Sequence, residues 1–183
     1  MSIDLQATLA SAKTIVGVLD AAGYKAHIVG GALRVLALGG ETSDVDIAVL
    51  CDDFGDFDDL HNTITDIQTT LLLALGFKFD LKHQSVAYRD TEFLADLRSD
   101  NINIICYAGW KVPTVKDLVD GFDLNINQWY FDEDGELVNH HFVGNAVHIN
   151  PKRDNPEQVN RLAERIARFK ELYPTLDWSA VNA

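Results

Sequence analysis

Apolar side chains recur at helical spacing from the beginning of the chain. This periodicity predicts an amphipathic helix over residues 4–22, which Gly23 ends. A short apolar run follows at residues 25–29, and the pair Gly30-Gly31 separates it from the helix-favouring run 32–38. This order predicts a strand, a tight turn and a second helix.

Alternation of polar and apolar residues begins at Asp44 and predicts a second strand over residues 44–50. Because side chains alternate between the two faces of a strand, Asp44 and Asp46 point the same way, opposite to the apolar residues between and after them. An acidic segment then leads into a predicted helix over residues 60–75, for which Gly76 is the expected C-cap.

Further strands are expected in the middle of the chain, at residues 77–81, 86–89 and 102–107. Alternation resumes over residues 124–131. The dipeptide Asp134-Gly135 is a typical two-residue hairpin turn and predicts a return strand over residues 136–142. The C-terminal part of the chain is therefore expected to contain a β-hairpin.

A last helix is predicted over residues 155–173, with Asn155 as N-cap and Pro156 at the first helical position. Strands and helices do not alternate regularly, which favours the α+β class. We expect a mixed, twisted sheet of about five strands flanked by helices, followed by the hairpin and the helix. No linker or repeat divides the chain, so a single domain over residues 1–183 with a core at about 24–142 is expected.

Acidic residues outnumber basic ones, and the formal net charge is −13. Such a molecule repels nucleic acid at long range, which excludes non-specific phosphate binding as its basis of recognition. A polyanionic substrate would need bound divalent metal or clustered arginines. No apolar stretch approaches the roughly 20 residues that cross a bilayer, and the N-terminus lacks a signal-peptide pattern. We therefore expect no membrane segment and a cytoplasmic location.

The paired acids and the paired glycines are the candidate chemistry. Magnesium and manganese prefer oxygen ligands and are commonly held by carboxylates together with substrate phosphates, a demand that Asp44 and Asp46 suit. The Gly30-Gly31 turn precedes a helix, whose first N–H groups and dipole attract phosphate. Arg34 can bind a phosphate through two parallel hydrogen bonds. Taken singly, these features also fit a solvated strand end, a plain turn and a surface arginine.

Their joint spacing resembles the signature of the polymerase-β-type nucleotidyltransferases. The match consists of VGGALR at residues 29–34, Gly39, and DVDI at residues 44–47, and it is most similar to the variant in tRNA CCA-adding enzymes and poly(A) polymerases. FDLNINQ at residues 122–128 resembles the later family motif Asp-Phe-Thr-Ile-Asn. Small nucleotidyltransferases of tailed phages carry a similar block, and a phage origin would place the protein in the host cytoplasm.

The resemblance implies a metal-dependent transfer of a nucleoside monophosphate from an NTP to a hydroxyl acceptor, with Mg²⁺ or Mn²⁺ as cofactor. The residues that it assigns to catalysis and metal binding are Asp44, Asp46 and Asp123. The residues that it assigns to nucleotide binding are Gly30, Gly31, Arg34, Asn103 and Asn127.

Two positions depart from the family pattern. Val35 stands where the family has an acid, and Asn103 stands where it usually has a third carboxylate. The Asn103 carbonyl can bind a metal, but the side chain is neither a base nor an anion. Asp123 is the alternative third acid, on one face with Asn125 and Asn127 if that run is extended. These three residues also fit the solvated side of an edge strand.

Several alternatives stay open at this stage. The acceptor is an RNA 3′ end, a protein hydroxyl or a small molecule, and the short segment after the hairpin argues against a whole tRNA. The basic stripe Arg161, Arg165 and Arg168 fits contact with a triphosphate or RNA as well as a solvated helix face. A catalytically weak relative that binds nucleotide or a partner protein is the second hypothesis. A dinucleotide-binding unit is excluded because residues 29–39 lack the required glycine spacing.

Overall fold

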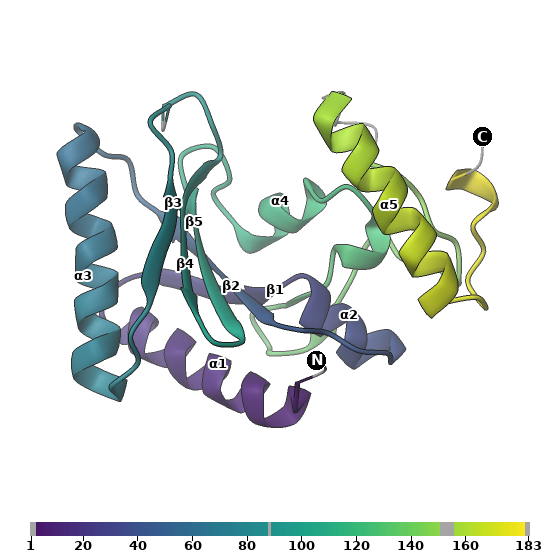
Figure 1. The fold of residues 1–183 in the computed structure, drawn as a ribbon, viewed down its shortest axis with the longest axis horizontal. Helices are drawn as coiled ribbons and strands as arrows, with labels where there is room; N and C mark the ends of the chain where they lie inside the picture. The colour runs from purple at the N-terminus through teal and green to yellow at the C-terminus, as the bar shows by residue number, and fades with distance from the viewer. Residues whose placement is uncertain (1–2, 88, 151–155, 182–183) are drawn as a thin grey trace.

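Seven strands pair into one sheet within the part of the chain that the computed structural model describes, residues 3–87, 89–150 and 156–181 (Figure 1). The strands are β1 (Lys25–Val29), β2 (Val45–Cys51), β3 (Asp80–Gln84), β4 (Phe93–Ser99), β5 (Ile102–Ala108), β6 (Tyr130–Phe131) and β7 (Leu137–Val138). The helices are α1 (Leu5–Ala21), α2 (Gly31–Leu38), α3 (Phe57–Leu75), α4 (Val115–Asp120) and α5 (Pro156–Leu172), with 3₁₀ turns η1 (Asn125–Asn127) and η2 (Ser179–Val181).

The sheet is mixed, with the strand order β3-β4-β5-β2-β1-β6-β7. β2 and β5 pair in parallel, and the other neighbours pair antiparallel. The register aligns Val29 of β1 with Asp46 of β2, and Asp46 with Asn103 of β5. Because residues opposite one another share a face, these three lie in one row across the middle of the sheet.

The boundaries of the first helices follow local signals in the sequence. Asp4 at the beginning of α1 and Asp56 at the beginning of α3 accept hydrogen bonds from backbone N–H groups of the first turn. Gly76 ends α3 in the left-handed conformation, and its N–H donates to the Leu72 carbonyl over 2.9 Å. The helices predicted here are confirmed, although α3 begins three residues earlier than expected, at Phe57.

α1 and α3 lie beside one another and cover one face of the sheet (Figure 1). Burial of the apolar stripes of both helices against the central strands forms the main core. Its fully buried members include Ala12, Ile15, Leu19, Ile47, Val49, Leu60, Ile64, Ile67, Leu71 and Ile104. The polar row at Asp46 and Asn103 is on the opposite face of the sheet, away from these two helices.

α4 packs on that opposite face. Its Leu118 and Val119 contact the cluster around Ala48 of β2. Thr114 caps the helix by accepting a hydrogen bond from the Asp117 N–H over 3.1 Å. α4 was not among the predicted helices, although the spacing of Thr114 and Asp117 is a helix-capping signal.

α5 belongs to a separate apolar cluster at the far side of α2. The buried members of this cluster are Leu124, Ile126, Val147, Phe169, Tyr173 and Trp178, and Leu162 and Ile166 of α5 pack against it. The predicted C-terminal helix is thereby confirmed, with its apolar stripe turned inward. The expected N-cap, Asn155, lies outside the described residues.

The α+β class and the mixed sheet are confirmed, but strands predicted in the middle of the chain are wrongly placed. The strand expected at residues 77–81 begins only at Asp80, as β3. Residues 86, 87 and 89 form turns, and the strand of this region is β4, which was not predicted. Its charged residues made it look like a loop in the sequence. Asp96 is nevertheless buried, and Arg98 donates hydrogen bonds to both of its carboxylate oxygens. The strands β1 to β5 agree with the expected sheet of about five, and the predicted hairpin joins them through the pairing of Val29 with Tyr130, which makes seven.

A 3₁₀ turn, η1, replaces most of the strand predicted over residues 124–131. Leu124 and Ile126 both reach the α5 cluster, while Asn125 is buried because its amide group bonds the backbone of the loop after β7. The apolar–polar–apolar pattern of residues 124–126 thus reflects a buried Asn125 amide between two buried apolar side chains, not a strand. The hairpin around Asp134-Gly135 is confirmed, but each of its strands has only two residues.

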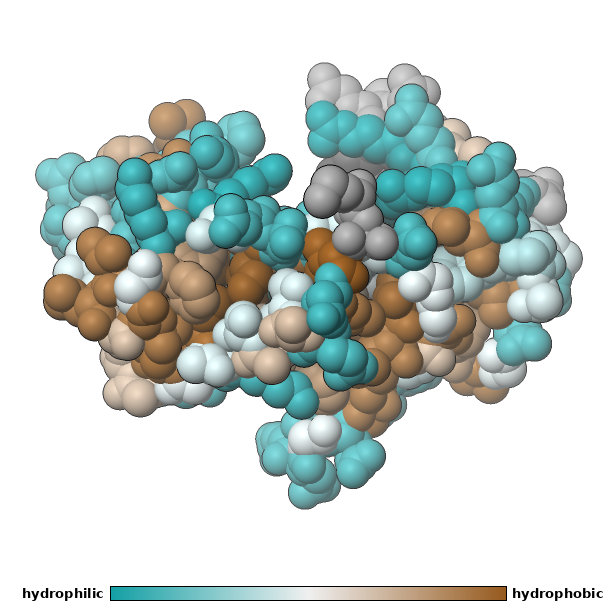
Figure 2. Space-filling model, turned by 60° about the horizontal axis from the view of Figure 1, so that its bottom comes forward, coloured by the Kyte–Doolittle hydropathy of each residue, from teal (hydrophilic) through white to brown (hydrophobic). Residues whose placement is uncertain are grey.

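Hydrophobic and hydrophilic side chains intermingle on the surface, and brown patches lie between teal ones on the face shown in Figure 2. The large apolar residues that stay exposed include Leu73, Val86 and Val143. Among the described residues, no helix combines the length and the apolar character needed to cross a membrane.

The main core gives a direct test of this packing. Ile104 is fully buried in β5, so Ile104→Ala is expected to lower the free energy of unfolding by about 2–5 kcal/mol through lost burial and a residual cavity. Leu73→Ala is the matched control, because Leu73 is 80% exposed and should change stability by less than about 0.5 kcal/mol. Urea unfolding of both variants measures the difference, and equal losses would contradict the fold.

Candidate functional site

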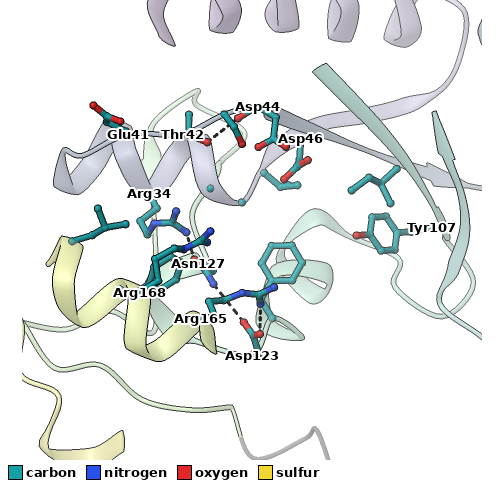
Figure 3. A pocket seen from close by; sticks show the side chains of 18 residues that line it. Arg34, Glu41, Thr42, Asp44, Asp46, Tyr107, Asp123, Asn127, Arg165 and Arg168 are labelled. Atoms are coloured by element: carbon teal, nitrogen blue, oxygen red, sulfur yellow. Dashed lines mark hydrogen bonds and ion pairs between the residues drawn. The ribbon is translucent and has the colours of Figure 1, made fainter. Parts of the chain in front are cut away.

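A cavity of about 660 Å³ opens between the polar face of the sheet, α2 and α5 (Figure 3). This volume falls in the usual range for small-molecule sites. Carboxylates line one wall and arginines line the other. Segments from β1 to α5 contribute to it, so residues more than a hundred positions apart in the sequence face one another.

The acidic wall consists of Asp44, just before β2, and Asp46 within it. Asn103 lies behind them on β5, and its amide nitrogen donates to Asp44 Oδ2 over 3.1 Å and to Asp46 Oδ1 over 2.9 Å. An amide NH₂ group has two hydrogens, so each carboxylate receives one. The bridge holds two like charges side by side.

The environment of Asp46 disfavours its charge. Part of its surface is open to the cavity, but the strands around the carboxyl group remove water, and this desolvation raises its pKa to about 6. The hydrogen bond from Asn103 opposes the shift, and repulsion from Asp44 adds to it. A cation bound beside the pair would relieve both the burial penalty and the repulsion.

The turn between β1 and α2 lies directly against this pair. Gly30 has φ +80°, a conformation that favours glycine, and it stands at the N-cap of α2. A Cβ atom at Gly30 would lie 3.3 Å from Asp46 Oδ2, so the missing side chain also leaves room for the carboxylate. The predicted strand, turn and helix are confirmed, and Gly31 begins the helix.

Arg34 forms the centre of the basic wall and is only 6% exposed. Its guanidinium carbon lies 4.2 Å from the centre of the Phe169 ring, Nε donates to Tyr173 Oη over 3.2 Å, and Nη1 donates to Asn127 Oδ1. Burial lowers its pKa, and the hydrogen bond with Tyr173 opposes this shift. Within the residues that the structure describes, no carboxylate forms an ion pair with Arg34.

Asp123 belongs to the basic wall. Its carboxylate forms an ion pair with Arg165 of α5, and Asn127 Nδ2 donates to it over 3.4 Å. Figure 3 shows Asp123 beside Arg165, across the cavity from Asp44 and Asp46. The described residues contain no group of three or more His, Cys, Asp or Glu side chains placed to hold one metal ion.

Most residues singled out from the sequence meet in this cavity. Those that line it are Gly30, Gly31, Arg34, Asp44, Asp46, Asp123 and Asn127. Asn103 contacts the acids from behind, so the two candidates for a third metal ligand, Asn103 and Asp123, lie at different places. Asn127 is buried on η1 rather than solvated on an edge strand, which overturns that reading of the motif.

The sequence left the role of the α5 arginines open and gave no sign of the aromatic residues that contact Arg34. Arg165 and Arg168 line the cavity, so they are not simply part of a solvated helix face. Phe169 and Tyr173 also face Arg34, and no local pattern signals this because their partner is about 135 residues away. Only the docking of α5 brings them together.

Solved structures were found that resemble this chain, whereas no family model and no curated protein matches its sequence. A CCA-adding enzyme in complex with ATP aligns with TM-score 0.60 and 16% identity, over 92% of this chain and 39% of that one. The Thermotoga maritima CCA-adding enzyme complexed with tRNA aligns with TM-score 0.59 and 17% identity, over 88% and 37%. A tRNA-processing enzyme in an apo form aligns with TM-score 0.53 and 20% identity, over 82% and 38%.

These likenesses show the fold. The chain has the α+β architecture of the matched part of CCA-adding enzymes, as the resemblance at residues 29–47 predicted. It spans less than half the length of each of those enzymes.

The close approach at Gly30 can be tested. Gly30→Ala is expected to lower the free energy of unfolding by about 1–3 kcal/mol through its positive φ. It should also weaken Mn²⁺ binding several-fold, because the new Cβ pushes against Asp46 Oδ2. Isothermal titration with Mn²⁺ and thermal unfolding measure the two effects.

Gly23→Ala is the matched control for this experiment. Gly23 also has a positive φ, +93°, but a Cβ there would meet nothing within 4 Å. It should therefore share the loss of stability and leave Mn²⁺ binding unchanged. Unchanged Mn²⁺ affinity in Gly30→Ala would contradict the predicted effect of this close approach.

Proposed function

We propose that this chain is a metal-dependent nucleotidyltransferase, which moves a nucleoside monophosphate from an NTP to a hydroxyl acceptor. The observation that carries the proposal is the division of one cavity into an acidic wall at Asp44 and Asp46 and a basic wall at Arg34, Arg165 and Arg168. Nucleotidyl transfer requires neutralised phosphates and aligned reactants more than covalent help from the protein. Both requirements concern charge and position, which this cavity supplies.

The triphosphate would lie between the Gly30-Gly31 turn and the arginines. N–H groups at the beginning of α2 and the helix dipole favour an anion there, and Gly30 and Gly31 place no side chain over these groups. Arg34 is a buried cation whose charge an anionic ligand would balance, and its planar group suits phosphate oxygens. Arg165 and Arg168 of α5 add positive charge to the same wall.

Mg²⁺ or Mn²⁺ would be held by Asp44 and Asp46 together with oxygens of the substrate. The donor set fits such an ion, because the two carboxylates share one face, that of Asp46 is largely desolvated, and their shared hydrogen-bond partner is the neutral Asn103 rather than a cation. The chemistry that the metal supplies is charge neutralisation on the phosphates and activation of the attacking hydroxyl. Asn103 keeps the two carboxylates in place for this role.

Asp123 receives a different role in this proposal. The resemblance assigned it to catalysis and metal binding, but its ion pair with Arg165 and its place across the cavity favour a task on the phosphate side. There it holds Arg165, and through Asn127 it supports Arg34. We propose that the metal site contains two acids rather than three.

The acceptor hydroxyl would belong to an RNA 3′ end, a protein or a small molecule. One similar structure is a CCA-adding enzyme complexed with tRNA, which makes RNA the first acceptor to test. The tRNA-binding properties of those longer enzymes are not carried over, because the chain matches only 37% of that one.

A second candidate is a weakly catalytic protein that binds nucleotide without transferring it. The observation that favours it is the neutral Asn103 beside the acidic pair, together with Val35 in place of an acid. Two carboxylates can hold a metal, but a third acid would strengthen the site. Measurement of binding and of transfer on the same preparation separates the two functions.

The transfer assay uses purified protein, Mg²⁺, each of the four α-labelled NTPs, and total RNA, total protein or a panel of small hydroxyl compounds as acceptor. We expect label transfer from at least one NTP, and a loss of at least about 100-fold in Asp44→Asn and Asp46→Asn, because each removes charge from the metal site. Asp52→Asn is the matched control, since Asp52 is exposed and lies outside the cavity. NTP binding without transfer would favour the second candidate, and absence of both would refute the proposal.

The role of Asn103 gives a separate prediction. Asn103→Asp replaces two donated hydrogen bonds with a third negative charge, so without metal the variant should lose about 1–3 kcal/mol of stability. Mn²⁺ should then raise its melting temperature more than that of the wild type, because three acids bind a cation more strongly. Asn101→Asp, at an exposed turn, controls for the added charge. Equal Mn²⁺-induced shifts in all three proteins would contradict the arrangement.

A further inference from the structure

Tyr173 follows the last residue of α5 and is buried against α2. It is 5% exposed, and its ring packs edge-to-face on Phe169 with 6.1 Å between ring centres. Its backbone N–H donates to the Phe169 carbonyl, and its own carbonyl accepts from Trp178 Nε1 over 3.1 Å. The α5 cluster therefore fixes both the backbone and the ring of Tyr173.

The hydroxyl group of Tyr173 bonds α2 at two points. It donates to the Gly39 carbonyl over 3.0 Å and accepts from Arg34 Nε over 3.2 Å. A phenol has a single proton, so donation to Gly39 leaves the oxygen lone pairs for the guanidinium group. The bond to the C-cap of α2 thus orients the hydroxyl as an acceptor for Arg34.

The chain leaves room for this contact at Gly40. A Cβ atom there would lie 3.2 Å from Tyr173 Oη, and Gly40 has φ +102°. A larger residue would be strained and would crowd the hydroxyl. Gly40 therefore allows Tyr173 to approach the end of α2.

The result is a guanidinium group fixed in one orientation. Nε is bound by Tyr173, Nη1 by Asn127, and the Phe169 ring covers one face. Nη2 lies close to the beginning of α2: a Cβ atom built at Gly31 would be 3.5 Å from it. Two of the five donors of Arg34 thus hold the group, and others face the place proposed for the triphosphate.

We infer that Tyr173 is a positioning residue for triphosphate binding, which acts through Arg34. The inference rests on the proposed function, since it assumes that Arg34 contacts phosphate. Tyr173 lies just after the end of α5 and would support triphosphate binding without itself touching the substrate. The effect should concern the phosphates and be the same for every base.

The test is Tyr173→Phe, which keeps the ring and removes only the hydroxyl. Isothermal titration with inorganic tripolyphosphate, and with each NTP, in the presence of Mg²⁺ should show about tenfold weaker binding, the loss expected when a hydrogen bond to a charged group is removed. In the transfer assay, KM for the NTP should rise while kcat changes less than about threefold. Tyr130→Phe is the matched control, because Tyr130 is 6% exposed and its hydroxyl bonds His140 over 2.9 Å outside the cavity.

A double-mutant cycle separates positioning from general stability. If Tyr173 acts through Arg34, then Arg34→Gln and the double variant with Tyr173→Phe should bind tripolyphosphate with equal affinity. Additive losses would overturn the inference. So would unchanged affinity in Tyr173→Phe, even if its melting temperature falls. If the wild type binds neither tripolyphosphate nor any NTP, the proposed function fails and the inference fails with it.

Discussion

The site depends on two like charges held side by side at the centre of the sheet. Asp44 and Asp46 share a face at the beginning of β2, and burial raises the pKa of Asp46 to about 6. The chain stabilises them with neutral groups: the Asn103 amide bridges both, and Gly30 leaves room for the Asp46 carboxylate. Burial of uncompensated carboxylates is costly. A cation that binds from the cavity would therefore stabilise the pair.

The basic wall carries positive charge that an anion would balance. Arg34 is buried without a carboxylate partner among the described residues, and the acid closest to this wall, Asp123, is paired with Arg165. A protein of net charge −13 would not attract a polyphosphate as a whole. Under the proposed function, the arginines opposite the acidic pair would overcome this repulsion locally, because a triphosphate with its metal ion would present negative charge to the basic wall and positive charge to the acidic wall.

α5 completes the cavity and belongs to a different apolar cluster from the central sheet. The fold likeness to CCA-adding enzymes is therefore only a starting point, since one fold supports many reactions and the function is decided at the site. In this chain the site includes the neutral Asn103 beside the acids and the contact of Tyr173 with Arg34. The sequence pattern pointed to Asn103, whereas no local pattern signals the contact between Tyr173 and Arg34.

The sequence by itself determined the strand, glycine turn and helix at residues 25–38 and the shared face of Asp44 and Asp46, because backbone periodicity and glycine conformation are local properties. It failed for β4 and η1, where Asp96 and Asn125 are buried by partners that no local pattern reveals. Which residues oppose the acids was decided by the tertiary structure alone. The pairing of β2 with β5 and the docking of α5 on α2 join segments far apart in the chain, and only long-range packing sets those distances.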